Sequence, residues 1–197
     1  MSRPADLSRA ATQASRVLLA RRVDALPVDP LALLKACRNT DVCTLEAALE
    51  ETGPLRAQVE GAVWDADAFT CTCKQGGELH YIIVYRTDGN PARLRFSLAH
   101  ELGHRILRHT GNDPVEEREA DCFASFLLCP EPVLRLLASL PGEAVERIVT
   151  ICYVSRSCAR VSLRRPPFLI DPVVMAALKK QLAPLLEDLE QTLLKSE

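Results

Sequence analysis

The sequence predicts an α+β fold that is mostly helical, with a small antiparallel three-stranded sheet. Residues 62–85 contain three short runs rich in β-branched and aromatic side chains, separated by polar or glycine-containing turns. The chain on either side carries apolar residues at helical spacing instead. Strands gathered in one segment and flanked by helices are typical of an α+β domain.

Three helices are expected ahead of the sheet. The first covers residues 5–22, where apolar residues lie on one side and arginines on the other. Asp29 and Pro30 supply an N-cap and a first-turn proline for a second helix, which ends near residues 37–38. A third short helix is expected over residues 45–51, after Thr44 as its cap.

The predicted strands are residues 62–64, 69–73 and 80–85, and short turns join them into a meander. A helix over residues 98–109 follows, with Ser97 as its N-cap and Gly111 at its end.

Further helices are expected over residues 115–128, 143–152 and 155–164. The composition changes after Pro166, where a terminal helix carries leucines at 4-3-4 spacing. We therefore expect one domain over residues 1–165 and a helical extension over residues 166–197, whose leucines either pack in the core or allow self-association.

Composition limits the possible partners and location. The formal net charge of −2 gives no general basis for binding nucleic acid or an anionic membrane. Residues 1–22 lack the continuous apolar stretch of a signal peptide, and no apolar run is long enough to span a bilayer. The eight cysteines are scattered and fit free buried thiols in a reducing compartment. A cytoplasmic location is therefore expected.

The most informative motif is His100-Glu101-Leu102-Gly103-His104. On a helix, residues four apart share one face, so His100 and His104 can reach the same metal ion. Glu101 would lie beside that ion and can take a proton from a metal-activated water as general base. The chemistry this predicts is metal-assisted hydrolysis of an amide.

A catalytic zinc ion needs a third protein ligand, and acidic residues downstream supply candidates. Glu117 and Asp121 are four apart and share a helix face with Ala120, whose small side chain would allow close packing against the motif helix. Glu117 is the favoured ligand, and Asp121 can orient a histidine by accepting its free ring N–H. Glu119 is the alternative ligand, although its different direction favours a solvated or salt-bridged side chain.

The two remaining histidines are not chosen as ligands. His80 is expected on the surface of a strand. His109 is expected at the end of the motif helix, where a positive charge would complement the helix dipole.

Residues 95–104, followed by 117–124 and 127–130, resemble the ImmA/IrrE family of metallopeptidases, and the similarity extends over roughly residues 8–165. This resemblance implies a zincin-like fold of the glutamate-zincin type. It also implies one Zn²⁺ ion held by His100, His104 and Glu117, with Glu101 catalytic. Members of the family are intracellular proteases that typically act on a separate helix-turn-helix repressor, which is the partner expected here.

The helix pair over residues 143–165 supports a different reading. Its second helix carries Arg156, Arg160, Arg164 and Arg165, as in a DNA-binding helix-turn-helix. The simpler interpretation is a helix pair that packs on the peptidase and exposes its arginines. A regulator built on this pair would leave the metal site structural or gated.

Overall fold

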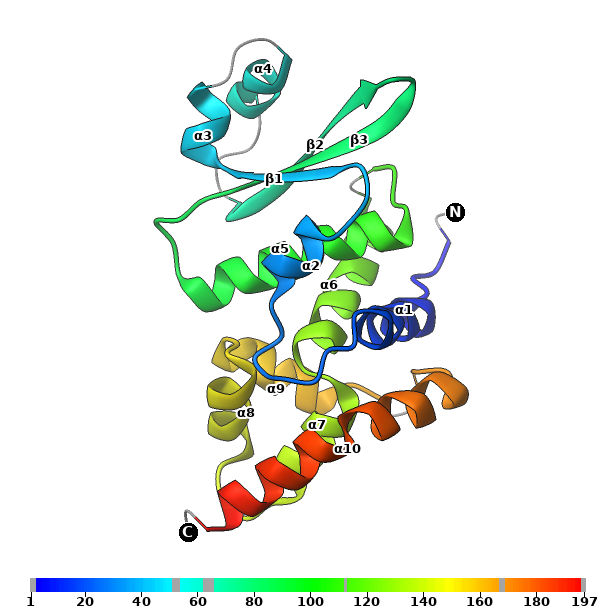
Figure 1. Ribbon diagram of the computed structural model, residues 1–197, viewed down its shortest axis with the longest axis vertical. Helices are drawn as coiled ribbons and strands as arrows, with labels where there is room; N and C mark the ends of the chain where they lie inside the picture. The colour runs from blue at the N-terminus through cyan, green and yellow to red at the C-terminus, as the bar shows by residue number, and fades with distance from the viewer. Residues whose placement is uncertain (1–2, 51–53, 62–65, 112, 167–168, 196–197) are drawn as a thin grey trace. The chain divides into compact units, whose positions relative to one another are not determined.

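The computed structural model describes residues 3–50, 54–61, 66–111, 113–166 and 169–195 (Figure 1). These residues form two compact units, one made of Met1–Val28 with Gly103–Glu197 and the other of Asp29–Leu102. The boundary falls inside one helix, α5 (Pro91–Leu107), which therefore contributes to both units. The sequence predicts a domain boundary at residue 165 instead, and that division stays a prediction.

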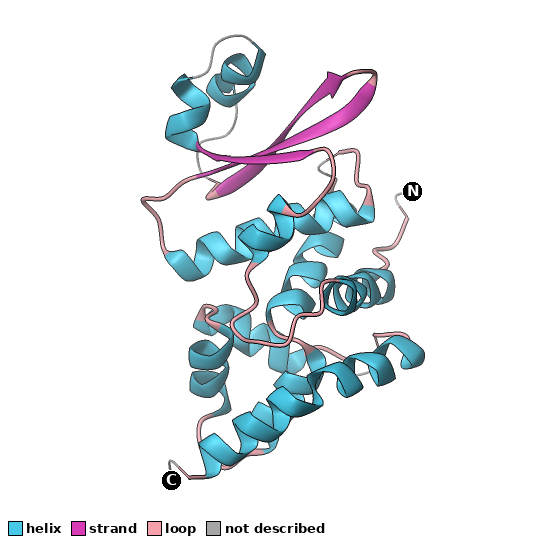
Figure 2. Ribbon diagram, in the orientation of Figure 1, coloured by secondary structure: helices cyan, strands magenta, loops and turns pink. Residues whose placement is uncertain are grey.

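The unit formed by Asp29–Leu102 contains one three-stranded sheet, drawn in magenta in Figure 2. Strands β2 (Ala68–Gln75) and β3 (Glu78–Tyr85) form an antiparallel hairpin, and β1 (Thr40–Thr44) pairs in parallel with β3. The strand order is β1-β3-β2, so the sheet is mixed and the predicted antiparallel meander is wrong in its third strand. The strand predicted over residues 62–64 lies outside the described residues.

Strand β1 escaped prediction because it is short and lies between two helix signals. Its five residues, Thr-Asp-Val-Cys-Thr, lack the alternation of polar and apolar side chains that marks a strand, and parallel pairing with β3 fixes them as one. Its last residue, Thr44, also serves the next helix, because its hydroxyl accepts a hydrogen bond from Ala47 N at 3.2 Å. The predicted cap of helix α3 (Leu45–Glu50) is thus confirmed.

The other helices of this unit are α2 (Pro30–Lys35) and α4 (Pro54–Gly61). Helix α4 was not predicted, because the proline at its start can also mark the end of a preceding helix. Helices α3 and α4 contact the sheet. Their shared core is formed by Leu45, Ala48, Val59, Cys71 and Val84.

Helix α5 begins and ends earlier than predicted. Asn90 Oδ1 accepts hydrogen bonds from Ala92 N at 3.0 Å and Arg93 N at 3.1 Å, so Asn90 caps the helix and Ser97 lies inside it. The helix ends at Leu107 rather than near Gly111, because Arg108 takes the left-handed conformation with φ 58°.

The described residues of the second unit form helices joined by turns and loops, and none of them lies in a strand. Its complete helices are α1 (Leu7–Ala20), α6 (Pro114–Leu128), α7 (Glu131–Ser139), α8 (Ala144–Cys152), α9 (Arg156–Arg164) and α10 (Pro172–Leu194). Helix α1 contacts α6 and α10, and α10 contacts α7. Helix α7, which was not predicted, begins directly after Pro130 and buries Val133 and Leu137.

Helix α10 packs into this unit through part of its leucine stripe. Leu178 and Leu182 are buried, which confirms the core-packing interpretation for these two residues. Self-association through the helix stays a prediction. None of the eight cysteines, all of which lie in the described residues, forms a disulfide, and three of them, Cys71, Cys129 and Cys152, are buried.

No single helix among the described residues has the length and apolar character needed to cross a membrane. Helices α6 and α7 together would meet that test by length and composition alone, with a bend of 62° between them.

Candidate metal centre

The predicted ligands come together in the structure. His100 and His104 lie one turn apart on α5, and Glu117 lies in the first turn of α6. His104 Nε2 is 3.4 Å from Glu117 Oε1. One ligand atom from each of the three residues lies within 4.8 Å of the other two. Two imidazoles and a carboxylate at this spacing can hold a metal ion and are a donor set that zinc accepts.

Close packing of α5 and α6 helps to bring His104 and Glu117 together. A Cβ atom added at Gly103 would lie 3.2 Å from Ala120 Cα and 3.1 Å from Phe123 Cδ1. Glycine at position 103 and alanine at position 120 thus let the backbones approach, which confirms the prediction made for Ala120. Asp113 caps α6 through hydrogen bonds from Val115 N and Glu116 N at 2.7 and 2.9 Å.

Glu101 follows His100 on α5 and is held from the sheet. The hydroxyl of Thr70, on β2, donates a hydrogen bond to Glu101 Oε2. Sequence reasoning missed Thr70, because register within the β2–β3 hairpin decides which of its residues face Glu101. The hydrogen bond restricts the orientation of the carboxylate proposed as general base.

His109 lies against His104 because of how α5 ends. With Arg108 left-handed, His109 N donates to His104 O at 3.0 Å, which is the six-to-one bond of a Schellman motif. The His109 side chain is only 2% exposed. Its Nδ1 lies 3.0 Å from His104 Nδ1, and its Nε2 lies 3.0 Å from Glu119 Oε2. The sequence predicts that His109 acts as a charge at the helix end and does not predict these contacts.

Glu119 is buried, with 1% of its side chain exposed. Both of its oxygens accept hydrogen bonds from the Arg3 guanidinium, and Asp6 N donates to Oε1 at 2.7 Å. The hydrogen bond from Arg3 is the main reason that the pKa of Glu119 is lowered to about 2. We call Glu119, Arg3, Asp6 and His109 the Glu119 cluster. The expected salt bridge is confirmed, and the solvated alternative is wrong.

A comparison with protein families decides the identity. The peptidase M78 family, described as an IrrE N-terminal-like domain, matches residues 56–161, which is more than half of the 197 residues. The chain belongs to this peptidase family. No curated protein matches the chain.

The match confirms the ImmA/IrrE assignment and agrees with the α+β zincin-like fold. It covers β2, β3, α5 and α6, and so includes every residue that we assigned to the metal centre. Because the chain belongs to a peptidase family, peptide-bond hydrolysis is the reaction to consider for the His-His-Glu cluster. Asp121 lies on the exposed part of α6, and its role in orienting a histidine stays a prediction.

Three of the four arginines of the helix pair, Arg156, Arg160 and Arg164, are exposed, and DNA binding by this pair stays an untested alternative. Arg156 pairs with Glu146 at 2.9 Å. Arg165 is 7% exposed and binds Glu131 Oε2 at 3.2 Å and Ser125 O at 2.8 Å. One of the four arginines of the predicted DNA-binding helix is therefore an internal structural residue.

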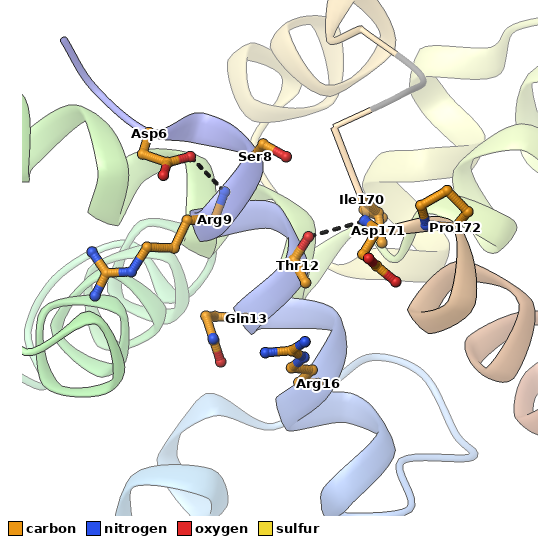
Figure 3. A pocket seen from close by; sticks show the side chains of 9 residues that line it. All are labelled: Asp6, Ser8, Arg9, Thr12, Gln13, Arg16, Ile170, Asp171 and Pro172. Carbon is orange, nitrogen blue, oxygen red and sulfur yellow. Dashed lines mark hydrogen bonds between the residues drawn. The ribbon is translucent and has the colours of Figure 1, made fainter.

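A separate open pocket of about 440 Å³ lies between α1 and the start of α10 (Figure 3). Its lining residues are Asp6, Ser8, Arg9, Thr12, Gln13, Arg16, Ile170, Asp171 and Pro172. Asp6 caps α1 by accepting from Arg9 N at 2.8 Å, and Thr12 accepts from Asp171 N at 3.0 Å. The pocket contains none of the proposed metal ligands.

Proposed function

We propose that the chain is a zinc-dependent endopeptidase in which His100, His104 and Glu117 hold one Zn²⁺ ion and Glu101 is the general base. The observation that carries this proposal is that one ligand atom from each of the three residues lies within 4.8 Å of the other two. Glu101 lies on α5 between the two histidines of this cluster. Membership of a peptidase family supports hydrolysis of a peptide bond as the reaction.

The donor set suits the ion. Zinc in catalytic sites takes three protein ligands, commonly two histidines and one glutamate, and keeps a position for water or substrate. When bound, zinc acts as a Lewis acid that polarises the scissile carbonyl and makes the attacking water more acidic.

Glu101 carries the proton transfers. Its carboxylate accepts a proton from the attacking water as the new C–O bond forms at the carbonyl carbon. It then donates that proton to the amide nitrogen as the C–N bond breaks, so the carboxylate is regenerated at the end of the cycle. Thr70 keeps the carboxylate oriented through its hydrogen bond to Oε2.

The substrate that we propose is a separate helix-turn-helix transcriptional repressor in the cytoplasm. The support is the resemblance to the ImmA/IrrE family, whose members typically cleave such repressors. The net charge of −2 agrees with a protein substrate rather than with direct binding to DNA.

The test combines metal analysis with cleavage of a helix-turn-helix repressor from the same organism. Wild-type protein should contain one zinc ion per chain and cut the repressor at one site, and a chelator should abolish cutting. Glu101→Gln should retain zinc and lose at least about a hundredfold in rate, as expected for removal of a general base.

Two variants on α6 provide a matched pair. Glu117→Gln should lose zinc, whereas Glu116→Gln, one position away and outside the cluster, should keep it. Zinc-loaded protein that cuts no repressor would favour a gated or binding role. Protein that binds no zinc would overturn the proposed function.

A further inference from the structure

We propose that His109 and Glu119 are positioning residues that fix the ring and tautomer of His104 for metal binding, through a hydrogen-bond chain with a single direction. This inference rests on the metal centre proposed above. Its basis is the continuous contact from Glu119 through His109 to His104, with 3.0 Å at each step.

The direction of the chain follows from the two nitrogens of an imidazole. His104 Nε2 faces Glu117, so it is the nitrogen that offers its lone pair to the metal. A neutral imidazole carries one N–H and one lone pair, so the proton of His104 must be on Nδ1. His109 Nδ1 lies 3.0 Å from His104 Nδ1 and can accept the hydrogen bond from that proton.

The same argument fixes His109. Because its Nδ1 accepts from His104, its own proton is on Nε2, which lies 3.0 Å from Glu119 Oε2. An ionised carboxylate only accepts hydrogen bonds, so Glu119 can end the chain but cannot reverse it. With a metal ion on His104 Nε2 and a neutral His104, one arrangement of protons satisfies all three groups: His104 Nδ1 donates to His109 Nδ1, and His109 Nε2 donates to Glu119.

The chain is held at both ends and is shielded from water. The Schellman turn places the backbone of His109, and Arg3 and Asp6 fix the Glu119 carboxylate. The side chains of His109 and Glu119 are 2% and 1% exposed, so bulk water cannot readily replace either partner. The two rings meet nearly at right angles, with an interplanar angle of 78° and centroids 4.9 Å apart.

The expected effect is on metal affinity. Partners that orient a metal-binding histidine contribute about 10- to 100-fold to affinity. Zinc affinity can be measured by competition with a chromophoric chelator, and the coordination by the absorption spectrum of the Co²⁺-substituted protein. Neither readout depends on finding the substrate.

Substitutions at position 109 separate the proposed direction from simple filling of space. His109→Phe removes both nitrogens and should weaken zinc binding about 10- to 100-fold. His109→Asn places an acceptor near the former Nδ1 and should restore much of the affinity. His109→Gln places its polar group near the former Nε2 and should not, although it is the larger side chain.

Two other residues serve as matched controls. His80 also pairs with a carboxylate, Asp41 Oδ2 at 2.8 Å, and His80→Phe should leave zinc affinity unchanged. Glu131 is 4% exposed and pairs with arginines, so Glu131→Gln is the control for Glu119→Gln, which should weaken zinc binding. Circular dichroism and thermal melting of each metal-free variant show whether it folds.

Each outcome bears on one of the two proposals. If folded His109→Phe binds zinc within threefold of the wild type, or if Asn and Gln restore affinity equally, the positioning role is wrong while the peptidase proposal stands. If the wild type binds no zinc, both fall. If Phe alone fails to fold, the comparison of Asn with Gln decides.

Discussion

Two buried carboxylates in the same unit can be compared directly. Glu119 and Glu131 are 1% and 4% exposed, and arginine side chains bind both. Arg3 binds Glu119 from the surface, because 51% of the Arg3 side chain is exposed. Arg165 binds Glu131 from the interior, with 7% of its side chain exposed.

The surroundings of the two pairs differ in kind. Glu119 faces the imidazole of His109, which contacts His104, a proposed metal ligand. Glu131 instead accepts hydrogen bonds from Arg135 and Arg165, and we call these three residues the Glu131 cluster. Arg165 also donates to the carbonyls of Ser125 and Cys129, and it stacks on Phe126 with 3.8 Å to the ring centroid. The Glu131 cluster thus ties helices together, whereas the Glu119 cluster can act on the metal site.

The largest loss of stability is expected from Arg165→Met. Burial lowers the pKa of Arg165, yet its carboxylate and carbonyl partners keep the charge compensated. Removing it leaves Glu131 buried with Arg135, which is 48% exposed, as its remaining cation in the cluster. We expect the free energy of unfolding to fall by about 3–5 kcal/mol, measured by urea denaturation of metal-free protein.

Arg164→Met is the neighbouring control, because Arg164 is exposed and should cost little. The double variant Glu131→Leu with Arg165→Met should be more stable than Arg165→Met alone, since it leaves no uncompensated charge. A single variant as stable as the control would show that the Glu131 cluster does not hold the fold.

The next effect is expected from Gly103→Ala, which acts where α5 and α6 come close. The added methyl group would lie 3.2 Å from Ala120 Cα, so the helices must separate by a few tenths of an ångström. We expect a loss of about 1–3 kcal/mol in thermal or urea unfolding. Zinc affinity should fall as well, because Glu117 moves with α6.

Gly61→Ala offers the matched glycine. A Cβ atom there meets nothing within 4 Å, so the substitution should be neutral or slightly stabilising. Equal effects at the two glycines would argue against close helix packing as a determinant of the metal site.

A smaller effect is expected from Arg3→Met. The carboxylate of Glu119 keeps its hydrogen bonds from Asp6 N and His109, and Arg9 lies 4.0 Å away. Zinc affinity should therefore fall less than in His109→Phe, with little change in melting temperature. Arg16 is exposed on α1, and Arg16→Met should change neither zinc affinity nor melting temperature. A loss of stability as large as that of Arg165→Met would erase the distinction between the two clusters.

The smallest expected effect is a difference in the alkylation rates of two cysteines. Cys122 lies on α6, as Glu119 does, and Cys129 lies next to the Glu131 cluster. Burial is the main reason that the pKa of Cys122 is raised to about 11, and a hydrogen bond with Cys152 is the main reason that the pKa of Cys129 is raised to about 12. Alkylation requires the thiolate, so both should react slowly at pH 8 and faster as the pH rises. Mass spectrometry of partly alkylated protein should show Cys122 reacting first.

The sequence was sufficient to predict the centre of the site. His100, Glu101 and His104 are related by helix geometry alone, and Glu117 lies in the first turn of the helix that was predicted after them. The family match covers all four positions. Local periodicity cannot predict the parallel pairing of β1, however, because its partner lies about forty residues away along the chain.

The Glu119 cluster was beyond sequence reasoning for two reasons. The turn that places His109 uses Arg108 at φ 58°, where glycine is the usual signal. Glu119 is buried by Arg3 and Asp6, which are 116 and 113 residues away in sequence. The sequence indicated that Glu119 lies on the helix surface, so the predicted salt bridge was right and the predicted exposure to solvent was wrong.

The turn after α5 also has a use for searching sequences. Because it fixes where His109 falls, the proposed positioning chain defines a sequence pattern: His-Glu-x-x-His at positions 100–104, a third histidine at 109 and a glutamate at 119. Chains of this peptidase family can be sorted by whether they carry that longer pattern. Those that carry the third histidine without the glutamate would be natural counterparts of Glu119→Gln.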